Sequence, residues 1–188
     1  MNFALAALRV LVGGLFVGHG LQKLAGKFGG HGLEGTGQFF ENGLGLKPGK
    51  AHAAAAGASE TAGGALLATG FLTPVAASML TGTMATAVKT VHIEKGVWNS
   101  DGGYEYNAVL VAVAFALTAA GPGRWSLDNA LGTTRAGLPI ALAAVGSGAL
   151  GGLAIASRAQ QEGEDEAAEP AAAAPAQSAE AVAEPVAA

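Results

Sequence analysis

Six ionisable side chains lie inside long apolar stretches of this 188-residue chain, and their types could support chemistry. They are Arg9, His19, Lys23, Glu60, Lys89 and His92. An ionisable group in an apolar membrane span is costly, so it is by default a candidate for handling ions, protons or a ligand. A structural role competes with this interpretation, because Lys and Arg side chains near the end of a run can extend to the membrane interface.

Spacing along the chain groups some of these residues. His19 and Lys23 are four residues apart and share one helix face, and Lys89 and His92 are three apart and do the same. Glu60 lies near the middle of its run, and its side chain is too short to reach the interface. We therefore predict that Glu60 faces the bundle interior, where it is either protonated or paired with a base from another helix.

Several other kinds of site are not predicted. The chain has no Cys, which excludes disulfides and thiolate ligands within it. The four His residues lack the close spacing of a motif such as H-E-x-x-H, so no metal site is expected. The Gly-rich stretches lack the strand and helix context of a nucleotide-binding loop. The absence of a basic stripe argues against nucleic acid as a partner.

Composition predicts a multi-pass protein of the cell membrane. Hydrophobic residues make up 51% of the chain and charged residues only 13%, against about 25% in soluble domains. About 20 apolar residues span a bilayer as a helix. The apolar runs are Phe3 to Leu24, His52 to Leu72, Val75 to Ile93, Tyr106 to Ala120 and Leu138 to Ala156. Their continuity favours helices over a membrane β-barrel. A cleaved secretory signal competes for the first run, but Arg9 lies inside that run.

The segments between the runs are also informative. Residues 36–42 contain Phe39 and Phe40 among polar neighbours, which favours a short interfacial helix, with a polar loop as the alternative. Trp98 and Tyr104, between the third and fourth runs, are residue types common at headgroup depth. Small residues at four-residue spacing favour close helix packing, with chance spacing in a Gly/Ala-rich chain as the alternative. These are Gly14 and Gly18, Gly148 and Gly152, the Ser78, Gly82 and Thr86 stripe, and the Ala108, Ala112, Ala116 and Ala120 stripe.

The predicted fold class is all-α: a polytopic membrane protein. Residues 1–130 are expected to form a four-helix transmembrane bundle, and residues 131–156 an additional transmembrane helix. Residues 157–188 contain half of the 14 acidic residues and no aromatic residue, so a disordered acidic Ala/Pro/Glu tail is predicted there.

Several motifs, in the same order, resemble those of the DoxX family. They are residues 18–24 (GHGLQKL), 29–30 (GG), 32–36 (GLEGT), 60–64 (ETAGG), 70–73 (GFLT), 102–107 (GGYEYN) and 121–128 (GPGRWSLD), together with Phe39, Phe40, His92, Gly96 and Trp98. The resemblance covers about residues 5–130. It implies a small bacterial four-helix membrane bundle.

The family resemblance bears on function only in part. The family takes its name from a subunit of an archaeal thiosulfate:quinone oxidoreductase, and some relatives are associated with oxidative-stress complexes at the membrane. Many members have no assigned activity. Two features depart from the family pattern: Thr73-Pro74 stands where relatives often carry Thr-Arg, and the fifth run and acidic tail extend beyond the family core.

Three functions remain open from the sequence. The first is a redox-linked, quinone-associated subunit of a membrane oxidoreductase or oxidative-stress complex, with electrons from a soluble redox partner and with no other cofactor evident. His exchanges protons near neutrality, since its unperturbed pKa is about 6.5. The second is a non-catalytic scaffold that recruits soluble partners, and the third is transport of a small solute or of protons. Whether the chain is an enzyme, and its oligomeric state, are left open.

We predict one polar mouth on a single side of the membrane. Its candidate residues are His19, Lys23, Glu60, His92 and Glu105. Two helices separate the first loop from the third, so both loops should lie on that side. Substitutions at Thr73, in the turn on the far side, are expected to be mild. The positive-inside rule would place the lysine-rich loops in the cytoplasm, but functional lysines would bias that count, so the orientation is left open.

Overall fold

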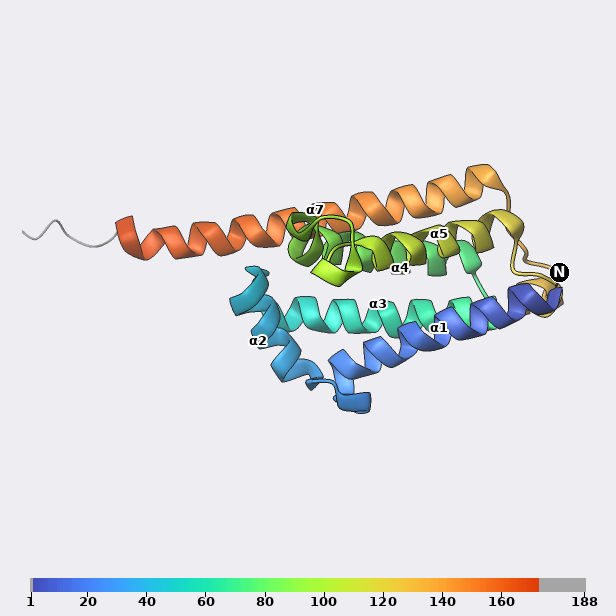
Figure 1. Cartoon of the computed structure of the whole chain (residues 1–188), viewed down its shortest axis with the longest axis horizontal. Helices are drawn as coiled ribbons and strands as arrows, with labels where there is room; N and C mark the ends of the chain where they lie inside the picture. Colours follow the sequence, from blue (N-terminus) through green and yellow to red (C-terminus); the bar gives the residue numbers. More distant parts are fainter. Residues whose placement is uncertain (1, 173–188) are drawn as a thin grey trace, which may run out of the picture.

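The computed structural model describes residues 2–172, with side chains described to residue 165, and this part of the chain is helical without strands (Figure 1). The long helices are α1 (Asn2–Ala25), α2 (Gly32–Leu44), α3 (Gly49–Thr69), α4 (Thr73–Ala87), α5 (Glu105–Ala120) and α7 (Leu138–Ala172). The short elements are η1 (Lys27–Gly29), η2 (Val88–His92), η3 (Ile93–Lys95), η4 (Asn99–Asp101) and α6 (Leu127–Ala130). All five predicted runs and the predicted helix around residues 36–42 are therefore helical.

The long helices lie in two layers. α1 packs along α3, and α7 packs along α4 and α5 (Figure 1). Contacts of α3 with α4 join the layers, and α2 lies against the first part of α3. The buried core between them is built by aliphatic and aromatic side chains that include Phe16, Leu67, Leu80 and Leu117.

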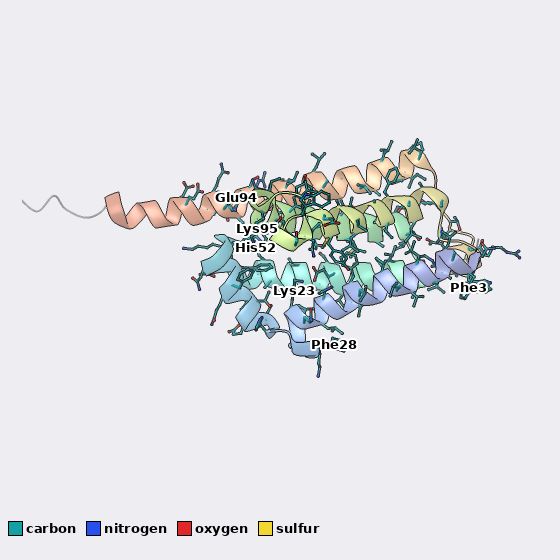
Figure 2. The ribbon with its side chains drawn as sticks, in the orientation of Figure 1. Phe3, Lys23, Phe28, His52, Glu94 and Lys95 are labelled. Carbon is teal, nitrogen blue, oxygen red and sulfur yellow. The ribbon has the colours of Figure 1, made fainter. Side chains whose placement is uncertain are left out.

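The bundle has two ends, formed by different elements. At the Phe3 end lie the start of α1, the α3–α4 turn and the segment with α6. At the other end, called here the α2 end, lie the end of α1, α2 and the α4–α5 connection. Figure 2 shows Phe28, His52, Glu94 and Lys95 toward the α2 end, away from Phe3. The predicted placement of the first and third loops at one end is confirmed.

Glycines set the close approach of α1 to α3. A Cβ on Gly13 would lie 2.5 Å from the Gly64 carbonyl oxygen, and one on Gly20 would lie 2.6 Å from that of Gly57. A Cβ on Gly14 or Gly18 would meet no atom within 4 Å. The prediction that Gly14 and Gly18 form the packing pair is therefore wrong, because the face of α1 that meets α3 carries its glycines seven residues apart.

The small-residue prediction for α4 and α7 is confirmed. A Cβ on Gly148 would overlap the Ser78 carbonyl oxygen, and one on Gly152 would overlap that of Gly82. The Ser78 and Ser147 hydroxyls lie 3.2 Å apart, and Thr86 donates its hydroxyl to the Gly152 carbonyl at 3.0 Å. By contrast, the alanine stripe of α5, residues 108 to 120 at four-residue spacing, lies exposed on the outside of the bundle.

Within the described residues, two helices are long and apolar enough to cross a membrane, judged by length and composition alone. They are α1 and the Leu138–Asp165 part of α7. α5 is apolar but shorter. The prediction of four spanning helices in residues 1–130 therefore goes beyond what helix length and composition establish.

The C-terminal prediction needs a correction. α7 continues to Ala172, so residues 157–172 are helical where a disordered tail was predicted. Ala and Glu favour helix, and Ala156 and Ala159 are buried. A Cβ on Gly163 would lie 2.7 Å from the Gly45 carbonyl oxygen, so α7 also approaches the end of α2. Residues 173–188 of the predicted tail lie outside the described residues.

Candidate functional site

A cavity of about 560 Å³ lies between the two helix layers toward the α2 end. Its wall is mostly apolar and includes Phe16, Phe40, Met84 and Leu110. Polar groups enter at separate points of this wall. They include His19, Lys23, His52, Ser59, Glu60, His92, Tyr106, Asn107 and Ser147. An apolar cavity with a few fixed polar groups is the usual form of a small-molecule site.

Lys23 and Glu60 form an ion pair in the wall of this cavity. Lys23 Nζ lies 2.6 Å from Glu60 Oε2 and donates a hydrogen bond to it. The Glu60 side chain is 6% exposed and that of Lys23 24%. The prediction that Glu60 faces the bundle interior is confirmed, and of the two states considered the structure shows the paired one, with Lys23 of α1 as the base. Such a pair places a proton donor and an acceptor in contact at the edge of an apolar space.

His19 lies one helical turn before Lys23 and belongs to a short chain of hydrogen bonds. Gln22 donates its side-chain amide to the Phe28 carbonyl at 3.2 Å, which fixes Gln22 Oε1 as an acceptor. His19 Nδ1 lies 2.9 Å from that oxygen and therefore donates to it. In the neutral ring, Nε2 is then the nitrogen that carries the lone pair.

His92 and His52 lie on other elements, and each also has one ring nitrogen hydrogen-bonded to an oxygen. His92 Nδ1 lies 2.6 Å from the Gly102 carbonyl oxygen, and His52 Nε2 lies 3.2 Å from that of Lys47. A carbonyl can only accept, so each ring donates one N–H and keeps its second nitrogen as an acceptor when neutral. His92 ends η2, a π-helical turn, and such turns are frequent at functional sites.

Glu105 is the predicted site residue that does not line the cavity. Its Oε2 accepts a hydrogen bond from the Asn99 backbone at 3.0 Å, and its side chain is exposed in the first turn of α5. Asn99 itself lines the cavity. Glu105 therefore fixes the loop beside the mouth, while His19, Lys23, Glu60 and His92 lie around one space. Lys89, although on the same turn as His92, does not line it.

The polar groups of this wall that sequence reasoning missed include His52, Tyr106 and Asn107. His52 starts a stripe with Ala56, Ser59 and Glu60 at helical spacing, so its position relative to Glu60 could have revealed it. Asn107 is 7% exposed, and its amide donates to the Met84 sulfur at 3.4 Å. Nothing in the α5 sequence alone distinguishes that face from the exposed one.

A second polar cluster lies at the Phe3 end, away from the cavity. Asp128 is 1% exposed and accepts hydrogen bonds from the Leu72 amide, the Thr73 amide and hydroxyl, and the Thr133 hydroxyl. Burial raises the pKa of Asp128, but these bonds, led by the Thr73 and Leu72 amides, outweigh it and lower the pKa below its ordinary value.

Arg9 completes this second cluster. It is 1% exposed, donates to the Trp125 carbonyl at 2.6 Å and is attracted by the Asp128 carboxylate. Arg9 thus lies far from Glu60 along α1 and does not neutralise it. The cluster joins α1, the α3–α4 turn and the segment with α6, so its role is structural.

The arrangement of the cavity defines the chemistry it can support. Among the described side chains, no group of three His, Asp or Glu is placed to hold a metal ion. The cavity instead offers one ammonium donor, one carboxylate and three imidazoles around an apolar space. These groups can bind carbonyl or hydroxyl oxygens and transfer protons to or from them.

Comparison with known proteins gives one family. Residues 4–93 match the family model DoxX. The match includes α1 to η2, and so His19, Lys23, His52, Glu60 and His92, but neither α5 nor α7. No match was found among curated proteins or among solved structures.

Proposed function

Because this chain belongs to the DoxX family, a membrane-associated family, we propose that it is a multi-pass membrane protein that binds a quinone between its helix layers. The Lys23–Glu60 pair would bind the ring and exchange protons with it, and electrons would come from a soluble redox partner. The observation that carries the proposal is the partly buried ion pair in the wall of an apolar cavity.

Exposed apolar side chains support the membrane part of the proposal. Leu11 and Leu15 on α1 and Leu142 and Leu150 on α7 are all exposed, as lipid-facing positions would be. A helix of 24 residues such as α1 is about 36 Å long, enough to cross a hydrocarbon core of about 30 Å.

Two exposed tryptophans support the same placement. Trp98 lies in the α4–α5 connection at the α2 end, and Trp125 lies at the Phe3 end. Trp is enriched at both membrane interfaces, because its ring is apolar and its N–H can reach water or headgroups. Two tryptophans at opposite ends of the bundle are what two interfaces would require.

The cavity suits a quinone in size and in chemistry. A volume of about 560 Å³ lies in the range of small-molecule sites, roughly 300–1,000 Å³. Quinone carbonyls need donors, which Lys23 Nζ supplies. The quinol hydroxyls need acceptors, which the second nitrogens of His19, His52 and His92 supply. Reduction of one quinone takes two electrons and two protons, and these side chains address only the protons.

Quinone binding by purified protein in nanodiscs tests the proposal. We expect wild-type protein to bind a short-tailed ubiquinone, and Glu60→Gln to weaken that binding at least about tenfold, since Lys23 loses its charged partner and reorients. Glu34→Gln is the matched control, because Glu34 forms an ion pair with Lys50 at 2.8 Å on the exposed surface of the same end. Absence of quinone binding by wild-type protein, or equal loss in both variants, would contradict the proposal.

A further inference from the structure

The cavity extends beyond the polar groups to a helix outside the matched family region. Ser147, Gly151 and Ile155 on α7 line it, four residues apart on one face. The neighbouring face, with Gly148 and Gly152, packs directly on α4 and also lines the cavity. The cavity therefore runs along both stripes of α7.

The α7 side of the cavity is open to the surroundings. Ile155 is 56% exposed, and a Cβ on Gly151 would meet no atom within 4 Å. Across the cavity from this stripe, Ala55 and Ala56 on α3 and Phe39 on α2 complete an apolar rim. These five residues, Phe39, Ala55, Ala56, Gly151 and Ile155, are called here the side opening.

The side opening lies on the flank of the bundle, with α7 on one side and α2 and α3 on the other. α7 continues past it, and Gly163 approaches the Gly45 carbonyl just beyond the end of α2. In a bilayer, an opening flanked by α3 and α7 faces lipid, so an apolar chain can pass through it without entering water.

We infer that this site takes an amphiphile, a ring with one long isoprenoid chain, whose head lies at Lys23 and Glu60 and whose chain leaves through the side opening. The inference rests on the proposed function and deepens it. The ammonium, carboxylate and imidazole groups of the lining lie on α1, α3 and η2, whereas the side opening carries none of them, so the cavity is polarised as such a ligand is. Gly151 is the residue that determines whether a long chain fits.

Two substitutions on α7 test the role of Gly151. Gly151→Leu adds a side chain at the side opening, where its Cβ would meet no atom within 4 Å. Gly146→Leu is the matched control, because a Cβ there also meets nothing within 4 Å and Gly146 does not line the cavity. Both changes favour helix equally. Thermal unfolding of each variant in detergent establishes that the bundle is intact.

The probes are two ubiquinones, one with a full-length isoprenoid tail and one with a single isoprene unit, each titrated in nanodiscs. We expect Gly151→Leu to weaken binding of the long-tailed form at least about tenfold and of the short-tailed form less than about twofold, because only the chain meets the new side chain. Gly146→Leu should change neither, and Glu60→Gln should weaken both.

The other possible outcomes contradict either this inference or the proposed function. If Gly151→Leu weakens both quinones equally or neither, the chain does not leave beside α7, and the inference fails while the head site stands. If wild-type protein binds neither quinone, the proposed function itself fails. A photoactivatable phosphatidylcholine that crosslinks at Ile155 and is not displaced by long-tailed quinone would show a membrane lipid there instead, which also overturns the inference.

Discussion

Thr73 donates both its backbone N–H and its hydroxyl to Oδ2 of Asp128, each at 3.2 Å, although the two residues are 55 positions apart. The Leu72 amide and the Thr133 hydroxyl donate hydrogen bonds to the other carboxylate oxygen, at 3.0 and 3.1 Å. Asp128 thus satisfies the first amides of α4 while it fixes the segment that leads to α7. Helix starts have unpaired N–H groups, and a carboxylate there is favourable.

Asp128→Asn should lower the free energy of unfolding by about 2–4 kcal/mol, because an amide NH2 would face N–H and O–H donors in a buried place and Arg9 would lose a nearby anion. Thermal and denaturant unfolding in detergent measure this. Asp101→Asn is the control, since Asp101 is exposed and the change in charge is the same. A similar loss in both variants would contradict the specific role of Asp128.

The lowered pKa of Asp128 gives that contribution a pH dependence. In the unfolded chain the pKa of an Asp is about 3.9. Its folded pKa is lower, so the stabilisation is fully present above the unfolded value and is lost as the pH falls toward the folded value. We expect the stability difference between wild type and Asp128→Asn to narrow as the pH is lowered from about 5 to about 3. A constant difference in the free energy of unfolding over that pH range would contradict a stabilising role for the hydrogen bonds to the Asp128 carboxylate.

Thr73→Val should cost about 1–2 kcal/mol, since Thr73 is fully buried and its hydroxyl bonds Asp128. The expectation that Thr73 substitutions have only a mild effect on function stays a prediction, since the burial of Thr73 bears on stability. Thr118→Val is the matched control, because Thr118 is equally buried but its hydroxyl bonds only the Ala114 carbonyl of its own helix. Unfolding in detergent should show a smaller loss for Thr118→Val, and the reverse order would refute the argument.

A double-mutant cycle measures the energetic coupling between Lys23 and Glu60. Lys23→Met alone leaves a carboxylate that is 5% exposed without its cation, so we expect it to lower stability more than the double variant Lys23→Met with Glu60→Gln. Unfolding of all four proteins in detergent gives the coupling energy. If the double variant is the least stable and the two losses simply add, the pair does not act as a unit.

Much of the helical framework could be predicted from the sequence, because apolar runs separated by Gly and Pro determine where helices begin and end. Thr73-Pro74 and Gly121-Pro122-Gly123 mark boundaries that the structure confirms. The helix beyond residue 156 was missed because Ala, Glu and Gln suit both a solvated chain and a helix. The decisive contacts, such as Gly163 near Gly45, are distant in sequence.

The sequence predicted only those site residues whose charge, inside an apolar run, required a partner from another helix. Glu60 in mid-run needed a base, and His19 and Lys23 shared a face, so their common wall was foreseeable. Arg9 carried the same sequence signal, yet its partners are Trp125 and Asp128, which no local pattern connects to it. Glu105 does not line the cavity, and its carboxylate accepts a hydrogen bond from the Asn99 backbone amide.

The glycines of α1 make the sharpest test of which helix face packs. Gly13→Ala should lower stability by at least about 2 kcal/mol or prevent folding, because its Cβ would lie 2.5 Å from the Gly64 oxygen and 2.6 Å from the Ala68 nitrogen. Both are backbone atoms, so the helices would have to move apart. Gly14→Ala, one residue later, adds the same methyl group into open space and should be neutral or stabilising by up to about 1 kcal/mol. Expression level and melting temperature in detergent compare the two variants. Equal behaviour of the pair would mean that α1 meets α3 through another face, and His19 and Lys23 would then be turned away from Glu60.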